Sequence, residues 1–197
     1  MKRIKILIII LIAVVGALLI YKHFEKIKPE EIELNKFSTE YTLVPEDNIY
    51  VYRSIDEIID ILSSQTGVVF MCTPTSEWCQ HYAVYLNNYL KKLNINEINY
   101  LNITEYRALN TVKYQKIVEL LDNYLYVDDI NNKKIYMPDL TFVKNGNIIA
   151  HDNETSLVSS ETKTEEYWTQ SKITEFYNKL NNFVTLLNKE EEPIITE

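Results

Sequence analysis

Strand-like and helix-like segments alternate from residue 48 to residue 188, and this alternation constrains the fold more than any other feature. Residues 68–72 form an unbroken apolar run, which is typical of a strand buried on both faces. Ser54, followed three residues later by Glu57, predicts a capping box at the start of a helix. The pair Asn145-Gly146 between two short apolar runs predicts a β-hairpin.

The apolar spacing gives the order β-α-β-α-β-α-β-β-α. Strands joined through helices imply a parallel part of the sheet, and the hairpin adds an antiparallel edge. The sequence therefore predicts an α/β fold with a central mixed sheet flanked by helices. The expected strands are 48–51, 68–72, 98–103, 139–144 and 147–150. Helices are expected from about residue 55, from about residue 78, over 111–124, and along the amphipathic positions of 173–187.

The N-terminus carries a membrane signal. Residues 6–21 contain no charge, Lys2, Arg3 and Lys5 precede them, and Lys22 follows. Sixteen residues are slightly fewer than the roughly 17–25 that cross a bilayer, but lysines can extend to both interfaces. The leading positive charges predict that the remainder lies outside the cell membrane. A cleaved signal peptide has the same layout, but no small-x-small cleavage site follows the run, so we expect a retained anchor.

Composition and charge divide the rest of the chain. We expect an anchor at 1–22, a stalk at 23–46, one folded domain at 47–188 and an acidic tail at 189–197. The net charge is −8, and because the first five residues carry +3, residues 6–197 carry −8 − 3 = −11. Such an acidic surface repels phosphate backbones, which argues against nucleic-acid binding. No cysteine or histidine cluster has metal-ligand spacing and no glycine-rich phosphate loop occurs, so no metal or cofactor is expected.

Four short segments, taken together in their order along the chain, resemble the thioredoxin family. Trp78-Cys79 follows a strand and a short loop, and Met137-Pro138 precedes the next-to-last strand. Residues 100–103 (Tyr-Leu-Asn-Ile) and 144–146 (Lys-Asn-Gly) resemble the third strand and the hairpin of that family. The likeness covers roughly residues 45–188 and is closest to membrane-tethered proteins of Gram-positive bacteria, including the bacteriocin-transport-accessory type. It implies a thioredoxin-like fold and a peptide groove at Trp78, Met137 and Pro138 beside a cis-proline.

The chain departs from the family where the chemistry occurs. A thioredoxin needs two thiols two residues apart, the first exposed at a helix N-terminus. Alignment here gives Ser76-Glu77-Trp78-Cys79, which puts a hydroxyl at the position of the attacking thiol and Cys79 at the resolving position. In a second alignment Cys79 is the exposed nucleophile and Tyr82 replaces the resolving sulfur. Spacing to the next strand favours the first alignment.

Cys72 is the other sulfur, seven residues before Cys79. A Cys72–Cys79 disulfide requires Cα atoms within about 7 Å and would suit an oxidising compartment. We instead expect Cys72 to be a small core residue, because free cysteine is often buried. His81 and His151 are expected at the surface.

Two functions follow from these observations. The first is a membrane-anchored extracytoplasmic module that binds an exported or membrane protein and has little dithiol activity, because Ser76 replaces a cysteine. The alternative is a thiol–disulfide oxidoreductase that acts on exported proteins through Cys79 alone or together with Cys72.

Overall fold

The computed structural model describes residues 36–128 and 132–189. The expected anchor at 1–22, the first part of the expected stalk and nearly all of the acidic tail lie outside these ranges. Within them, no helix is both long and apolar enough to cross a membrane.

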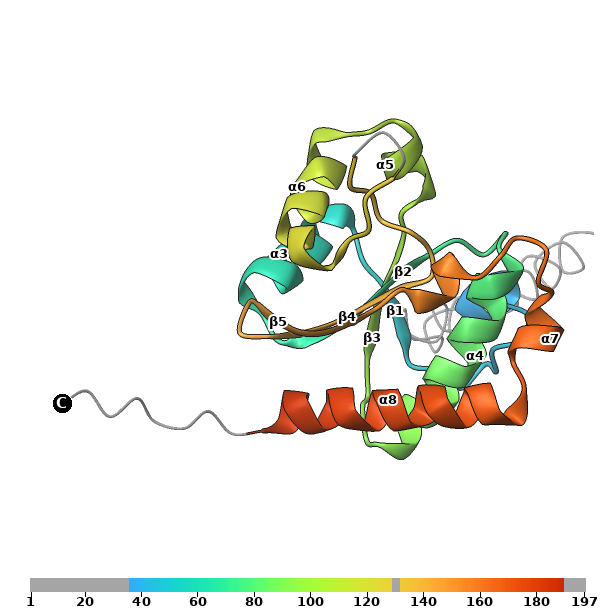
Figure 1. The fold of residues 1–197 in the computed structure, drawn as a ribbon. Helices are drawn as coiled ribbons and strands as arrows, with labels where there is room; N and C mark the ends of the chain where they lie inside the picture. The colour runs from blue at the N-terminus through green and yellow to red at the C-terminus, as the bar shows by residue number, and fades with distance from the viewer. Residues whose placement is uncertain (1–35, 129–131, 190–197) are drawn as a thin grey trace, which may run out of the picture.

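Five strands form one mixed sheet, which confirms the predicted fold class (Figure 1). They are β1 (Tyr50–Tyr52), β2 (Gly67–Cys72), β3 (Ile98–Asn102), β4 (Asp139–Lys144) and β5 (Asn147–Asp152). Their order across the sheet is β1-β3-β2-β4-β5. The first three are mutually parallel, whereas β4 runs antiparallel to β2 and β5 antiparallel to β4.

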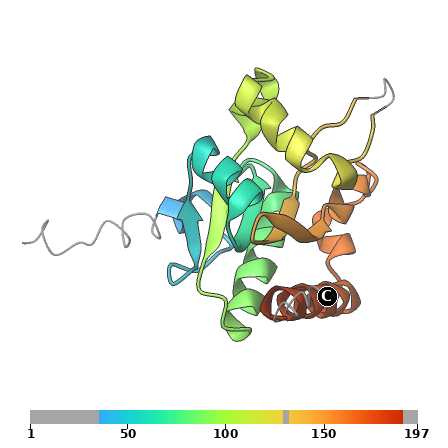
Figure 2. The ribbon, with the colours of Figure 1, turned by 90° about the vertical axis from the view of Figure 1, so that its left-hand side faces the viewer.

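Helices cover both faces of the sheet. One face packs against α3 (Ile55–Ser64) and α6 (Val112–Leu120), and the opposite face packs against α4 (Glu77–Lys92) and α8 (Gln170–Asn188) (Figures 1 and 2). Three short helices were not expected from the sequence: α5 (Thr104–Ala108), η2 (Glu154–Leu157) and α7 (Thr164–Tyr167). Segments this short carry too few apolar positions to show a helical period. The 3₁₀ turn η1 (Asp122–Tyr124) lies at the end of the helix predicted over residues 111–124.

Local signals in the sequence explain where two elements begin and end. The capping box is present, because the Ser54 hydroxyl accepts from the Glu57 amide while the Glu57 carboxylate accepts from the Ser54 amide. At the hairpin, Asn145 and Gly146 both have positive φ, of 49° and 73°. A Cβ on Gly146 would lie 2.3 Å from the carbonyl oxygen of Ser63, so only glycine fits where the hairpin meets the end of α3.

Part of the expected stalk belongs to the folded core. Phe37 and Tyr41 have no exposed surface. Phe37 lies in a short helix at residues 36–40, and Tyr41 follows directly after that helix, about one turn further on. The Phe37 ring stacks on Tyr50 in β1 with centroids 3.8 Å apart, and the Tyr41 hydroxyl donates to the Tyr100 hydroxyl at 3.1 Å. The expected boundary at residue 46 therefore lies too late, because these aromatic residues cover the edge of the sheet at β1.

Candidate functional site

The start of α4 and the proline turn lie side by side at one end of the sheet. The antiparallel register pairs Met71 in β2 with Asp139 in β4. Cys72 follows Met71 at the end of β2, and Pro138 precedes Asp139 at the start of β4. The end of β2 therefore adjoins the proline turn. The Met137–Pro138 peptide bond is cis, and Pro138 is buried.

Cys72 and Cys79 form a disulfide with a Cα–Cα distance of 6.0 Å. The expectation that Cys72 is a free core residue was therefore wrong. The loop between the cysteines folds back through a turn, in which the Ser76 amide donates to the Thr73 carbonyl at 3.2 Å, and this brings the two Cα atoms within bonding reach. Neither cysteine has exposed surface, and the Thr73 amide donates to the Cys79 sulfur at 3.4 Å.

Ser76 is the N-cap of α4, and Cys79 is the third residue of the helix. The Ser76 hydroxyl accepts from the Cys79 amide at 3.4 Å, so its oxygen satisfies one of the free amides at the helix start. A hydroxyl therefore lies at the start of this helix. The second alignment, with Cys79 as an exposed nucleophile, does not agree with a fully buried, disulfide-bonded sulfur.

Trp78 is half-buried on the outer side of α4 and packs against α7. Its ring meets the Tyr167 ring edge-on with centroids 5.2 Å apart, and Tyr85 of the same helix meets Trp168 at 5.0 Å. Met137 is also half-buried and packs between the two cores on either side of the sheet. No signal in the sequence pointed to α7 as a wall beside Trp78, because a four-residue helix has no readable period.

A buried charged pair lies on the α3/α6 face of β4 and β5. His151 Nε2 is 3.0 Å from a carboxylate oxygen of Asp139, and both side chains are almost fully buried. His151 is therefore not the surface residue that was expected. Burial lowers the pKa of His151, but the charge of Asp139 and its hydrogen bond outweigh burial and hold that pKa above its ordinary value.

A second polar cluster lies on the α4/α8 face of the same strands. The Tyr82 hydroxyl donates to Asp152 at 2.6 Å, and Lys179 of α8 reaches the other Asp152 oxygen at 2.6 Å and Glu154 at 2.7 Å. Burial, and then the Asp152 charge and hydrogen bond, raise the pKa of Tyr82 far above its ordinary value. Sequence reasoning missed this cluster because its residues lie far apart along the chain.

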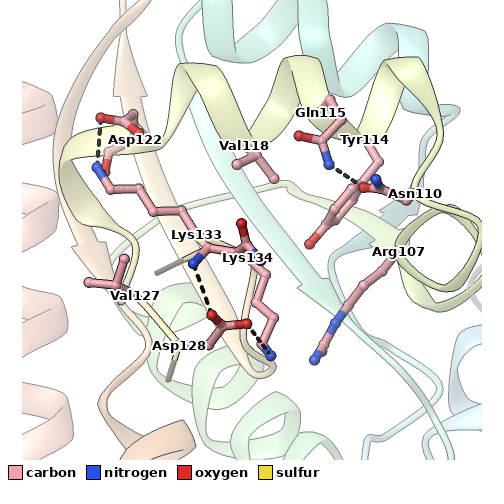
Figure 3. Close-up of a pocket in the computed structure, with 11 residues that line it drawn as sticks. Arg107, Asn110, Tyr114, Gln115, Val118, Asp122, Val127, Asp128, Lys133 and Lys134 are labelled. Carbon is pink, nitrogen blue, oxygen red and sulfur yellow. Dashed lines mark hydrogen bonds and ion pairs between the residues drawn. The ribbon is translucent and has the colours of Figure 1, made fainter. Parts of the chain in front are cut away.

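A wide hollow of about 820 Å³ lies beside α5 and α6 (Figure 3). Two ion pairs line it, Lys133 with Asp122 at 2.7 Å and Lys134 with Asp128 at 3.1 Å. None of the residues predicted from the sequence as site residues lines this hollow, so it stands apart from the disulfide and the proline turn.

The described ranges contain no group of three or more histidine, cysteine or acidic residues that could hold a metal ion. Comparison with known protein families, curated proteins and solved structures found no match.

Proposed function

We propose that this chain is a thioredoxin-like, membrane-anchored module that binds an extended segment of an exported or membrane protein and does not turn over disulfides. Its binding surface is the region of Trp78, Met137 and Pro138. The anchor is the apolar N-terminal segment, which keeps the domain outside the cell.

The arrangement of the sheet supports the thioredoxin-like assignment. Three parallel strands are extended by an antiparallel hairpin, a helix begins directly after the central strand β2, and a proline turn lies beside that helix start. The sequence resemblance implied this adjacency of Trp78-Cys79 and Met137-Pro138.

Burial of the disulfide is the observation that carries the proposal. Thiol–disulfide exchange needs an attacking thiolate to reach a sulfur, and neither sulfur of the Cys72–Cys79 pair has exposed surface. The position that a thioredoxin gives to its exposed thiol holds Ser76, whose hydroxyl is a weak nucleophile and caps the helix. The bond then acts as a staple that fixes the start of α4 against the end of β2.

The disulfide also supports the proposed location, because such bonds persist in oxidising compartments. The positive charges before the apolar segment favour the same orientation, with the domain on the outer side of the membrane.

One observation favours the alternative function, a thiol–disulfide oxidoreductase. The Thr73 amide donates to the Cys79 sulfur, and Cys79 lies in the first turn of α4. Both effects would stabilise a Cys79 thiolate after reduction. In that reaction the reduced pair would pass two electrons and two protons to a substrate disulfide and close again to the Cys72–Cys79 bond.

Two measurements on the full-length chain in mild detergent separate the functions. The first is reduction of insulin by dithiothreitol, for which we expect no acceleration over dithiothreitol alone. The second is binding of a reduced, carboxymethylated, permanently unfolded protein, for which we expect saturable binding that Trp78→Ala weakens about tenfold. Tyr106→Ala, on the other side of the sheet, is the matched control and should bind normally. Insulin reduction that Cys79→Ala abolishes would replace the proposal with the alternative.

A gain-of-function variant tests the alignment itself. Because Cys79 is already bonded to Cys72, the double variant Cys72→Ala/Ser76→Cys frees Cys79 and completes a Cys-Glu-Trp-Cys motif. We expect the introduced thiol to form a disulfide with Cys79 under oxidising conditions, and we expect the variant to reduce insulin. Failure to form this bond in a correctly folded variant would contradict the thioredoxin-like alignment.

A further inference from the structure

The wide hollow beside α5 and α6 carries one positive charge without an acidic partner in the described part of the chain. Three cations and two carboxylates line it, which gives a net charge of +1: Arg107, Lys133, Lys134, Asp122 and Asp128. Lys133 pairs with Asp122, and Lys134 pairs with Asp128. Within the described ranges the Arg107 guanidinium has no carboxylate in ion-pair distance, so the surplus charge lies on this residue.

An aromatic ring holds the Arg107 side chain. The guanidinium carbon lies 5.8 Å from the centre of the Tyr136 ring, and the Lys134 ammonium lies 5.2 Å from the same centre. Two positive groups therefore approach one ring, and Arg107 is half-buried there. A guanidinium held against a ring presents a planar fork of N–H donors, which is the geometry that binds the two oxygens of a carboxylate.

The hydroxyl of Tyr114 is a third donor at the same place. Its oxygen accepts from the Ile135 amide at 3.1 Å, and no acceptor for its proton occurs among the described residues. Figure 3 shows the Tyr114 ring reaching from α6 into the hollow, with the hydroxyl on the side of Arg107. Burial raises the pKa of Tyr114, whereas the Ile135 hydrogen bond and then the charges of Arg107 and Lys134 lower it. Both cations therefore act on this hydroxyl.

Charge and volume limit what the three donors can bind. One carboxylate would neutralise the net charge of +1, whereas a phosphate group, with about −1.5 to −2 charges, would leave the hollow negative within a chain that is already acidic. The buried carboxylate of Asp139 also acts on Tyr114, but it is paired with His151. A volume of about 820 Å³ leaves room for the group that carries the carboxylate, and Val118 and Val127 supply apolar lining for it.

We infer that this hollow binds a monocarboxylate, with the Arg107 fork on its two oxygens and the Lys134 ammonium and Tyr114 hydroxyl as further donors. A small organic acid and the C-terminus of a peptide share this chemistry. The inference goes beyond the proposed function and does not rest on it, because Trp78, Met137 and Pro138 do not line the hollow.

The arginines give separate reports on the site. The chain contains Arg3, Arg53 and Arg107, so a nitrogen–proton correlation spectrum of arginine-labelled protein contains one side-chain Nε–H signal for each. The variants Arg53→Lys and Arg107→Lys assign two of them. Arg53 is the internal control, because its Nε already donates to Asn99 at 2.7 Å and its guanidinium pairs with Glu97.

The full-length chain in mild detergent is titrated with four probes at constant ionic strength. They are isobutyrate, the dipeptide acetyl-Ala-Val with a free terminal carboxylate, the matching dipeptide amide, and inorganic phosphate. We expect the Arg107 signal to move saturably with both carboxylates, at concentrations about tenfold lower than with the amide or with phosphate. Tighter binding of the dipeptide acid than of isobutyrate would identify a chain terminus as the ligand, and the reverse order would identify a small acid.

Two lysine variants test the site itself, again through the Arg107 signal. Lys134→Gln removes a donor and the net positive charge, so it should raise the dissociation constant about tenfold. Lys116→Gln, which removes the same charge from the exposed surface of α6, is the matched control and should bind as the wild type does. An Arg53 signal at its wild-type position verifies that each variant is folded.

Four results would overturn the inference. They are an Arg107 signal that stays in place, equal movement with the dipeptide acid and its amide, phosphate binding as tight as carboxylate binding, and equal affinities of the two lysine variants. Parallel movement of the Arg53 and Arg107 signals would also overturn it, because it would show a general effect of anions on the arginines.

Discussion

The two faces of the sheet differ in how they are built. On the α4/α8 face, nine of the 21 buried core residues are aromatic, and the disulfide lies among them. On the α3/α6 face, one of 15 is aromatic, namely Tyr114, and the rest are aliphatic. The buried polar groups differ as well, because the α3/α6 face buries the pair Asp139–His151, whereas the α4/α8 face buries the cluster of Tyr82, Asp152 and Lys179.

This difference suggests two roles, in which the α3/α6 face is the scaffold that stabilises the sheet and the α4/α8 face carries the proposed binding surface. Aliphatic side chains pack densely and contain no polar atoms that need a hydrogen-bond partner. The core on the α3/α6 face therefore stabilises the sheet. Aromatic residues combine a large apolar surface with a polar edge, which suits a face that must also recognise another molecule. The disulfide and Trp78 lie on the aromatic face, whereas Met137 contacts the cores on both faces.

The largest expected effect comes from the scaffold face. His151→Leu removes the partner of a buried carboxylate, Asp139, and should cost about 3–5 kcal/mol of unfolding free energy. Urea unfolding at pH 7 measures it. His81→Leu, on the half-buried surface of α4, is the matched control and should change stability by about 0.5 kcal/mol or less. Equal effects of the two variants would mean that the Asp139–His151 pair does not stabilise this face.

On the aromatic face, the disulfide should be the next largest contribution. Cys72→Ala/Cys79→Ala opens a short loop with a sequence separation of seven and should cost about 2–3 kcal/mol, still below the effect of His151→Leu. Thermal and urea unfolding of the double variant, of the untreated wild type and of the reduced wild type measure this difference. A double alanine variant as stable as the oxidised wild type would show that the staple contributes nothing.

A smaller effect is expected at the centre of the aromatic face. Tyr82→Phe removes one hydrogen bond to Asp152, which keeps its contact with Lys179, so we expect a loss of about 1–2 kcal/mol. Tyr85→Phe on the same helix is the control, with an expected change of about 0.5 kcal/mol or less. If the two tyrosine variants behave alike in urea unfolding, the Tyr82–Asp152 bond is not a source of stability.

The smallest expected effect is a pH dependence that belongs to the scaffold face. The folded pKa of His151 is raised, so its contribution is fully present below the unfolded value of about 6.5 and is lost as pH rises through the folded value. The unfolding free energy of the wild type should therefore exceed that of the double variant Asp139→Asn/His151→Gln by more at pH 6 than at pH 9. Urea unfolding at both pH values tests this, and a larger gain at pH 9 would contradict the direction of the shift.

Local patterns predicted most of the fold. The capping box of Ser54, the hairpin at Asn145-Gly146 and the start of a helix near residue 78 depend on residues close together in sequence, and all three are present. The burial of His151 could not be foreseen, because it depends on Asp139 across the hairpin. The disulfide likewise depended on how the loop folds back, which spacing leaves open. Aromatic residues at Phe37 and Tyr41 were a signal that could have moved the domain boundary earlier.

The early start of the core would also limit how far the domain could lie from the proposed membrane anchor. With the proposed anchor ending at Lys22 and a folded core that begins by residue 36, the connecting segment would be residues 23–35, which is 36 − 22 − 1 = 13 residues. Even at full extension, at about 3.6 Å per residue, it reaches only about 50 Å. Under the proposed anchoring, a partner would therefore have to present its segment close to the lipid surface.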